Sequence, residues 1–375
     1  MHTVQEGSHS IADAVALCRP EVIASYPITP QTHIVERLAA LIADGRLDAE
    51  YINVESEHSA VSVVAGSTAC GIRSYTSTSS QGLALMHEVL HAISGMRLPV
   101  VMTVANRALS APLNIWNDHS DSMSQRDTGW IQLYAENVQE AVDMHIQAYR
   151  LAESRNVMLP AMVCIDGFVL THVYEPVMLP EQSEVDNFLP HFNPENKLDP
   201  SNPLTMGAYA TPDDYMEFKY EQQKAMEKAR EEIKKINKHF SKQFGREYGD
   251  GLIEVYGEGD IALIAAGSIC GTIKDAADKF NFSLIRIRCY RPFPISELRK
   301  AVKKFTSIGV IDRAFSYGFA GQLFSEVKSV IDIPVKGFVA GLGGRDVRIE
   351  DVMNAVSKIE SVDVEDKPVW IGLRC

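Results

Sequence analysis

The feature that most constrains this chain is the regular alternation of short apolar runs with stretches of helical periodicity. In the first 170 residues, the apolar runs that predict strands are 22–26, 51–54, 73–76, 99–105 and 160–165. The stretches that predict helices are 11–17, 32–43, 59–69, 83–93 and 139–153. Strands that alternate with helices in this way form parallel sheets covered by helices. The pattern therefore predicts an α/β domain with a doubly wound parallel sheet.

A second unit of the same kind follows in the last third of the chain. The stretch 176–203 is rich in Pro and Asn, which predicts a surface loop. A long amphipathic helix is predicted next from apolar residues at helical spacing, namely Met226, Ala229, Ile233, Ile236 and Phe240. From residue 261 to residue 357, strand and helix patterns alternate again. The predicted parts are an α/β domain over 1–205, a connecting helix and linker over 206–255, and a smaller α/β domain over 256–375.

Composition and charge exclude several classes of protein. The formal net charge is −13 and there is no basic block, so we expect no nucleic-acid partner. The smallest gap between any two of the six cysteines is 19 residues, from Cys270 to Cys289. Without a CxxC pair, the chain lacks the local signature of a zinc ribbon, a thioredoxin-like site or an iron–sulfur cluster. No apolar run reaches about 18 residues and no signal peptide is recognisable, so we expect a cytoplasmic protein without a membrane span.

One local motif points to a metal site. His87, Glu88 and His91 form HExxH on a predicted helix. In zinc peptidases the two histidines of this motif bind the ion and the glutamate serves as the base. The extended form of the motif needs Gly and His where this chain has Ser94 and Arg97. A helix with one polar side explains the same residues, and a zinc peptidase stays as a remote alternative.

Three glycine motifs allow two interpretations each. Gly249-Asp250-Gly251 has the order of an Mg²⁺-diphosphate motif, but it follows a polar stretch and precedes a strand, which predicts a turn. Residues 341–344 begin like a dinucleotide-binding loop, although Asp346 stands where the third glycine is needed. Residues 267–272 join a strand to a helix and could either hold an anion on backbone N–H groups or form a tight turn.

Polar residues gather after the strands of the first predicted sheet. Thr29 follows the first strand, Glu55 and Glu57 follow the second, and Arg107 follows the fourth. The other polar strand ends are Ser79–Gly82, Asn106 and Asp166–Gly167. Ligands of doubly wound sheets bind at the carboxyl ends of the strands, and a guanidinium beside hydroxyls and a carboxylate suits a small anionic substrate. Strand ends are often polar in any case, so this pattern alone leaves both interpretations open.

The same segments carry a family resemblance. In chain order they are SYPITP at 25–30, ESEHSA at 55–60, TSSQGL at 78–83, NRALS at 106–110 and NIWNDHSD at 114–121. Together they resemble the alpha subunit of the multi-subunit 2-oxoacid:ferredoxin oxidoreductases, most closely pyruvate:ferredoxin oxidoreductase (pyruvate synthase). Residues 291–294 and 337–344 are similar to the second domain of that family. The resemblance implies a thiamine-diphosphate-type pyrimidine domain followed by a smaller domain like the C-terminal domain of transketolase.

The resemblance also implies a reaction and partners. The family holds thiamine diphosphate between two chains, with the diphosphate and Mg²⁺ on the beta subunit and iron–sulfur clusters in partner subunits. The implied assembly is a dimer of heterotetramers with beta, gamma and delta subunits. The implied reaction oxidises pyruvate with coenzyme A to acetyl-CoA and CO₂, reversibly, and reduces ferredoxin. The segment 108–112 favours pyruvate, and branched-chain or aryl 2-oxoacids or oxalate stay as alternative substrates.

Residue roles follow from the same resemblance. Glu57 matches the glutamate that hydrogen-bonds N1′ of the aminopyrimidine, where a carboxylate promotes proton transfer from the thiazolium ring. It is preferred over Glu55 because its distance along the chain to Gly66 and Gly71 fits the family helix. Thr29 matches the threonine at the oxo end of the substrate, and Arg107 matches the arginine that binds the carboxylate. The other implied cofactor-binding residues are Pro27, Ile28, Ser80 and Gln81, and no metal ligand is implied in this chain.

Overall fold

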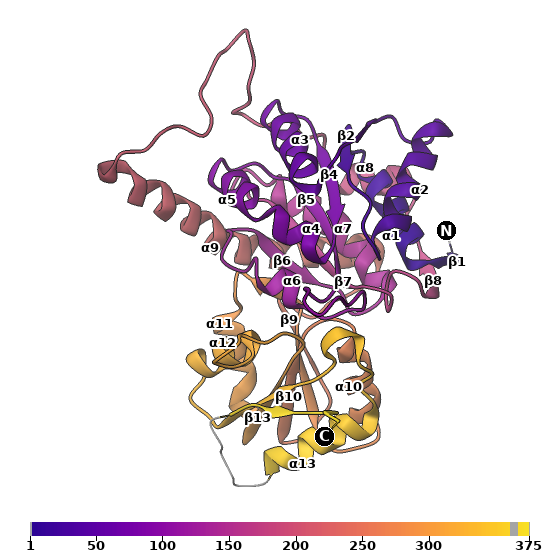
Figure 1. Cartoon of the computed structure of the whole chain (residues 1–375), viewed down its shortest axis with the longest axis vertical. Helices are drawn as coiled ribbons and strands as arrows, with labels where there is room; N and C mark the ends of the chain where they lie inside the picture. The colour runs from indigo at the N-terminus through magenta and orange to yellow at the C-terminus, as the bar shows by residue number, and fades with distance from the viewer. Residues whose placement is uncertain (1, 361–366, 375) are drawn as a thin grey trace.

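The computed structural model describes residues 2–360 and 367–374, which form two α/β units, one above the other in Figure 1. The first contains a seven-stranded sheet in which every neighbouring pair runs parallel except β12 and β6. In sheet order the strands are β12 (Cys289–Arg291), β6 (Ile131–Tyr134), β7 (Ala161–Asp166), β5 (Val101–Asn106), β4 (Ser74–Thr78), β2 (Val22–Ser25) and β3 (Glu50–Asn53). The helices of this unit are α1 (Gly7–Leu17), α2 (Thr32–Ala43), α3 (Glu57–Ala69), α4 (Ser80–Leu85), α5 (His87–Gly95), α6 (Ser120–Met123) and α7 (Val138–Ala152). The predicted α/β class with a parallel sheet is confirmed.

The second unit contains a six-stranded sheet. In sheet order its strands are β15 (Val369–Trp370), β14 (Val335–Val339), β13 (Ser307–Asp312), β10 (Ile261–Ala265), β11 (Ser283–Ile287) and β9 (Ile253–Tyr256). Its helices are α10 (Ile269–Ala277), α11 (Ile295–Ala301), α12 (Gln322–Val330) and α13 (Ile349–Glu360), with short 3₁₀ turns η1 (Val302–Lys304) and η2 (Leu342–Gly344). Only β9 runs antiparallel to its neighbour. The second α/β unit is therefore also as predicted.

Several elements differ from the sequence prediction. The helix predicted over 83–93 is two helices, α4 and α5, which meet at Met86. The loop predicted over 176–203 is wrong in its first half, because it contains the end of β8 (Tyr174–Met178) and α8 (Gln182–Phe188). β8 pairs antiparallel with β1 (His2–Glu6) at the other end of the first unit. β8 is stabilised by pairing with a strand at the start of the chain, and such a distant pairing leaves no local sequence pattern that predicts the strand.

One strand links the two units. β12 follows β11 of the second sheet in the chain but pairs antiparallel with β6 at the edge of the first sheet. At the end of β12, Arg291 donates two hydrogen bonds of 2.7 Å to the carboxylate of Glu326 in α12. The first sheet is thus completed by a segment that the sequence pattern places in the second domain.

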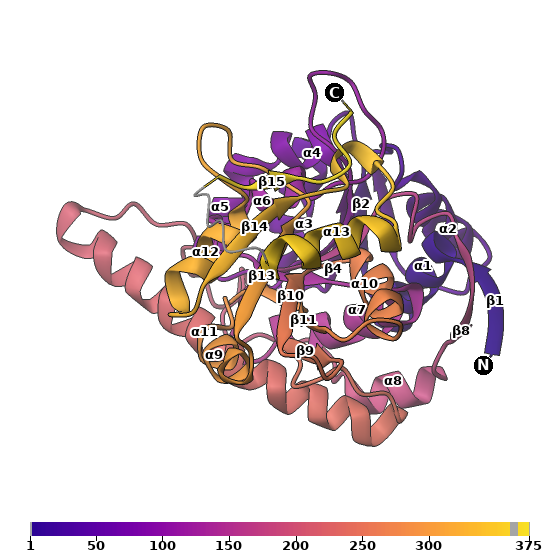
Figure 2. The same ribbon diagram turned by 90° about the horizontal axis from the view of Figure 1, so that it is seen from below.

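The predicted long amphipathic helix is confirmed. α9 (Pro212–Phe244) buries Ala225, Ala229, Ile233, Ile236 and Phe240, and Met226 is half-buried. Its buried stripe packs against α7. Residues 211–220 are exposed, and this end of the helix extends away from the rest of the chain in both views (Figures 1 and 2). Among the described helices, α9 included, none has a stretch long and apolar enough to cross a bilayer.

Candidate active site at the carboxyl ends of the strands

The turn that follows β2 is held by one buried glutamine. The Nε2 atom of Gln31 donates a hydrogen bond to Ser77 Oγ at 2.6 Å, and its Oε1 accepts one from the Ile28 N–H at 3.3 Å. These contacts tie the turn to β4 and leave Thr29 and Pro27 exposed at its tip. Gln31 was not among the predicted site residues. Its position directly after the proline-bracketed threonine was the available signal.

Arg107 reaches this turn from the end of β5. Its Nη1 donates to the Thr29 carbonyl oxygen at 2.9 Å, and its Nε donates to the Asn114 carbonyl oxygen at 3.0 Å. Burial lowers the pKa of the Arg107 guanidinium. Within the described residues, Nη2 has no hydrogen-bond partner. The structure therefore brings together the two residues predicted to bind the oxoacid, and it leaves one guanidinium N–H group able to bind an anion.

A buried aspartate organises the same edge of the sheet. Asp121 is 1% exposed, and its Oδ2 accepts hydrogen bonds from the backbone N–H groups of Ser80 and Arg107, each at 2.9 Å. Its Oδ1 accepts from Asn106 Nδ2 at 2.8 Å. Burial raises the pKa of the Asp121 carboxyl to about 6, although these hydrogen bonds oppose the shift. Asp121 therefore joins the ends of β4 and β5. This role could not be predicted from the segment 114–121 alone, because it depends on contacts with distant residues.

Ser80 occupies a conformation that non-glycine residues rarely adopt. Its φ is +47°, in the left-handed region, which costs of order 1–3 kcal/mol. Three contacts hold it there: its N–H donates to Asp121, and its hydroxyl oxygen lies 2.6 Å from both the Ala108 carbonyl oxygen and Gln81 Oε1. Strained backbone that is held by its surroundings is typical of functional sites. The two predicted residues Ser80 and Gln81 thus lie side by side at the start of α4.

Glu57 begins α3, and its carboxylate lies against α4. The side chain is buried, and a Cβ atom at Gly82 would come within 2.6 Å of its Oε1, so only glycine fits there. Within the described residues, no group donates a hydrogen bond to this carboxylate. Glu55 is different: it is exposed and accepts a hydrogen bond from the Ser59 hydroxyl, which lowers its pKa. The choice of Glu57 over Glu55 is supported by burial and by its lack of a partner.

Several other polar atoms at the carboxyl ends of β4 and β5 and the start of α4 are buried without a partner. In the described part of the chain they are Thr78 Oγ1, Ser79 Oγ, Gln81 Nε2 and Asn106 Oδ1. Buried polar groups are almost always hydrogen-bonded, so a group of exceptions needs an explanation. Donors and acceptors left at one edge of a sheet are suited to a polar ligand that binds there. The edge therefore has the features of a binding site as well as those of ordinary polar strand ends.

The predicted anion-binding turn over 267–272 does bind an anion, and that anion is a side chain of this protein. The Ser268 N–H donates to Asp166 Oδ2 at 2.7 Å, and its hydroxyl donates to the same oxygen. Arg313 Nη1 lies 2.9 Å from Asp166, and His119 Nε2 lies 2.9 Å from its other oxygen. Burial alone would raise the pKa of Asp166, but the Arg313 and His119 charges hold it well below its usual range. The turn thus joins the two units.

The other two glycine motifs are structural. In Gly249-Asp250-Gly251, Asp250 Oδ1 accepts hydrogen bonds from the N–H groups of Leu252 and Ile253, each at 2.9 Å, which makes the predicted turn. In the segment 341–344, the Gly343 N–H donates to Asp118 at 3.1 Å, and a Cβ at Gly344 would lie 2.3 Å from the Cβ of Trp116. The dinucleotide-loop interpretation is therefore not supported, because this turn packs against the loop that follows β5.

The HExxH residues lie on α5 with their histidine rings 5.0 Å apart. The His87 Nδ1 atom is 2.6 Å from Gln125 Oε1. Among the described residues, no third His, Cys, Asp or Glu joins His87 and His91 in a group able to hold an ion. The remote zinc-peptidase alternative thus gains nothing from the structure.

A cavity of about 1580 Å³ lies elsewhere, under the loop that precedes α9. Its lining comes from 95–99, 189–196, 204–210 and parts of α9, and it includes none of Thr29, Glu57 and Arg107. The candidate site at the carboxyl ends of the strands is therefore separate from this cavity.

Comparisons with known proteins identify the family. The family model for "Pyruvate flavodoxin/ferredoxin oxidoreductase, thiamine diP-bdg" matches residues 13–238, and the model for "Pyruvate:ferredoxin oxidoreductase core domain II" matches residues 259–352. Pyruvate synthase subunit PorA of Methanosarcina barkeri is 50% identical over 373 residues, which cover 96% of this chain and 92% of the relative. Ketoisovalerate oxidoreductase subunit VorA of Pyrococcus furiosus is 44% identical, with 99% and 98% covered.

Solved structures share the fold. A 2-oxoglutarate:ferredoxin oxidoreductase from Magnetococcus marinus aligns with a TM-score of 0.75 at 19% identity, over 96% of this chain and 65% of that one. A split-gene transketolase aligns with a TM-score of 0.55 at 14% identity, over 95% and 98%. Both bear out the predicted pairing of a pyrimidine-type domain with a transketolase-like second domain. Together with the family models, which cover both α/β units, and the full-length relatives, these findings show that the chain belongs to the pyruvate:ferredoxin oxidoreductase family.

Proposed function

We propose that this chain is the alpha subunit of a cytoplasmic pyruvate:ferredoxin oxidoreductase that is active only as part of a complex. The complex oxidises pyruvate with coenzyme A to acetyl-CoA and CO₂, reversibly, and passes the electrons to ferredoxin. The observation that carries the proposal is the convergence of Thr29, Arg107 and Glu57 on one sheet edge. Arg107 contacts Thr29 directly, and Asp121 and Ser80 connect it to the segment that packs on Glu57. The proposed domains are 1–205, 206–255 and 256–375.

The residues around Glu57 fit the aminopyrimidine half of thiamine diphosphate. When bound, this cofactor supplies a carbanion that can attack the oxo carbon of the substrate. The Glu57 carboxylate would accept a hydrogen bond from the pyrimidine, and the unpartnered Gln81 Nε2 at the start of α4 offers a donor. Gly82 lets the Glu57 carboxylate lie against the start of α4. Pro27, Ile28 and Ser80 would contribute the rest of this half-site.

Within the described residues, the one glycine-flanked aspartate of this chain is not free to serve a diphosphate site. Asp250, the one aspartate in a suitable motif, uses its Oδ1 atom to form a turn. The proposal therefore places the diphosphate and its Mg²⁺ on a beta subunit, and it places iron–sulfur clusters in partner chains. The five described cysteines are all free thiols in separate places, which is in keeping with that division. The cofactor is thus held between two chains.

Partner subunits would also cover apolar surface that this chain exposes. The first turns of α9 and the loop before it carry Tyr209, Tyr215, Met216, Phe218 and Tyr220, each more than half exposed. A group of exposed aromatic side chains is typical of a protein interaction site. We propose beta, gamma and delta partners in a dimer of heterotetramers, with ferredoxin binding through a partner.

Arg107 gives the first test of substrate binding. We expect Arg107→Ala to raise the KM for pyruvate roughly 10- to 100-fold, because a charge-assisted hydrogen bond to a carboxylate contributes about 1.5–3 kcal/mol. The KM for coenzyme A serves as the internal control and should stay unchanged. Steady-state kinetics of the reconstituted complex measure both values. An unaltered KM for pyruvate would show that Arg107 does not bind the carboxylate.

A substrate panel tests the proposed reaction as a whole. The chain alone should show no turnover, and the complex with its partner subunits should reduce viologen dye in the presence of pyruvate and coenzyme A. We expect the highest kcat/KM for pyruvate among pyruvate, 2-oxoglutarate, oxalate and branched-chain and aryl 2-oxoacids. A VorA relative is almost as similar as the PorA relatives, so 2-oxoisovalerate is the decisive competitor. A higher kcat/KM for that acid would overturn the assignment of pyruvate.

A further inference from the structure

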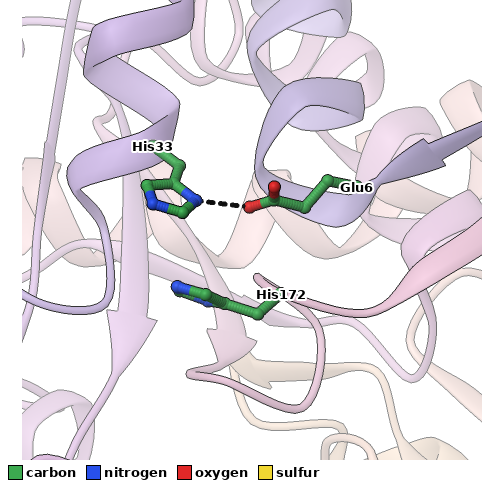
Figure 3. A group of neighbouring side chains, drawn as sticks. All are labelled: Glu6, His33 and His172. Atoms are coloured by element: carbon green, nitrogen blue, oxygen red, sulfur yellow. Dashed lines mark hydrogen bonds and ion pairs between the residues drawn. The ribbon is translucent and has the colours of Figure 1, made fainter.

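Three side chains with metal-binding atoms meet in the first unit, outside the proposed active site. Glu6 ends β1, His33 lies in the first turn of α2, and His172 follows β7. One possible ligand atom from each residue lies within 4.8 Å of the other two. Figure 3 shows the Glu6 carboxylate facing the His33 ring, with the His172 ring below them. Residues from three separate segments thus converge on one small space.

The contacts inside this group leave it able to bind an ion. His33 Nδ1 is 2.6 Å from Glu6 Oε1, and the rings of His33 and His172 have centroids 4.7 Å apart. His172 Nδ1 is 2.7 Å from Thr171 Oγ1, so Nε2 is the ring atom available to a ligand. Metal-bound histidines typically use their second ring nitrogen to bind an outer acceptor, which is the role that Thr171 can fill here.

An ordinary carboxylate–histidine hydrogen bond accounts for Glu6 and His33, and His172 packs against Phe168 with ring centroids 4.8 Å apart. Among the described residues, however, no hydrogen bond uses His172 Nε2. Two imidazole rings with centroids 4.7 Å apart repel each other when both are protonated. A neutral imidazole is the form that ligates metals. Glu6 is buried, whereas the His33 side chain is 42% exposed, so the group is open to solvent on one side.

We propose that Glu6, His33 and His172 form a binding site for one divalent transition-metal ion, with Zn²⁺ as the best match. Two imidazole nitrogens favour Zn²⁺ over Mg²⁺ and Ca²⁺, which take oxygen ligands. Three protein ligands leave a fourth position for water. With metal–ligand bonds of about 2.0–2.1 Å, the ligand atoms must stand about 3.3 Å apart. Glu6 Oε1 and His33 Nδ1, now 2.6 Å apart, would separate slightly, and the His172 ring, whose ligand atom lies within 4.8 Å of both, would complete the site by a small side-chain adjustment. The ion would join β1, α2 and the segment after β7.

Metal binding to the full, untagged chain tests the proposal. The chain should bind one Zn²⁺ after removal of bound metal by chelation, as measured by calorimetry and by metal content. Co²⁺ in place of Zn²⁺ should give the strong visible absorption of a four-coordinate site. This absorption can be measured directly, because no iron–sulfur cluster is predicted in this chain to mask it. Zn²⁺ should also raise the melting temperature of the chain, because an ion that binds only the folded state stabilises it.

Variants locate the ion. His33→Ala and His172→Ala should each weaken Zn²⁺ binding on the order of 100-fold or more and abolish the thermal shift, with an unchanged circular dichroism spectrum. The matched control is the double variant His87→Ala/His91→Ala, which removes the HExxH histidines on α5 and should bind Zn²⁺ like the wild type. Absence of stoichiometric binding by the wild type would overturn the proposal. Loss of binding in the α5 control alone would overturn it as well, because the ion would then lie at HExxH.

Discussion

Glu57→Gln should lower the turnover of the reconstituted complex on the order of 10²- to 10⁴-fold, the range expected when a general acid–base group is removed. Glutamine keeps the size of the side chain, so the close packing against Gly82 is preserved. It cannot exchange a proton with the cofactor as a carboxylate can. Stopped-flow and steady-state measurements with pyruvate and coenzyme A check the result.

Glu55→Gln is the matched control for this experiment. Glu55 lies two residues earlier, is exposed, and bonds only to Ser59 among the described residues. We expect its turnover to stay within about twofold of the wild type, because surface substitutions have small effects. Equal losses in both variants, or no loss at Glu57, would show that the cofactor role is assigned wrongly.

Stability measurements distinguish a lost function from a damaged fold. Within the described residues, the Glu57 carboxylate has neither a hydrogen-bond donor nor an ion-pair partner, so neutralising it breaks no internal contact. We therefore expect the melting temperature of Glu57→Gln to be equal to or above that of the wild type. Loss of turnover in a chain of unchanged stability would assign the effect to the reaction itself.

Much of the fold could be predicted because its main signals are local. α2 has the predicted bounds, 32–43, because it has a clear apolar period. The parallel strands β2, β5 and β7 of the first sheet are buried and therefore read as largely apolar runs. Thr29 and Arg107 could be predicted to lie close together, because the carboxyl ends of parallel strands share one edge of the sheet.

The rest depends on contacts between distant segments. β12 pairs with β6 through Cys289 and Leu133, which are 156 positions apart in the chain (289 minus 133), and no local pattern encodes such a pairing. Asp121 acts through backbone N–H groups of Ser80 and Arg107, and these meet only in the folded chain. Local spacing pointed to His87 and His91 as metal ligands, whereas the three-residue group with Glu6 comes from three separate segments.

The contact between the two units contains a buried charge network centred on Glu140 of α7. Glu140 Oε1 accepts hydrogen bonds from Arg286 Nη2 and Arg288 Nε, each at 2.8 Å, and all three side chains are about 1% exposed. Arg286 belongs to β11 and Arg288 follows it, so one carboxylate joins the helix of the first unit to the second sheet. Removal of one member of a buried network leaves the other charges without compensation, which destabilises proteins strongly.

Glu140→Gln should therefore lower the free energy of unfolding of the chain by about 3 kcal/mol, seen as a lower urea midpoint. The matched control is Glu254→Gln. Glu254 Oε2 lies 2.9 Å from Nε of the same Arg286, but its side chain is 27% exposed, so we expect a loss of at most about 1 kcal/mol. Equal midpoints for Glu140→Gln and the wild type would show that the network does not hold the two units together.

The pH dependence of the same variant gives a second, independent result. Burial alone would raise the pKa of Glu140, but the Arg286 and Arg288 guanidinium groups override it and hold the pKa at about 2, below the ordinary value of 4.5. A carboxyl with a lowered folded-state pKa stabilises the protein above its unfolded pKa and loses that contribution as the pH falls toward the folded value. The difference in urea midpoint between wild type and Glu140→Gln should thus be full at pH 7 and shrink between pH 4.5 and 2. A difference that stays constant over this range would mean that packing, and not the charge of Glu140, stabilises the contact between the units.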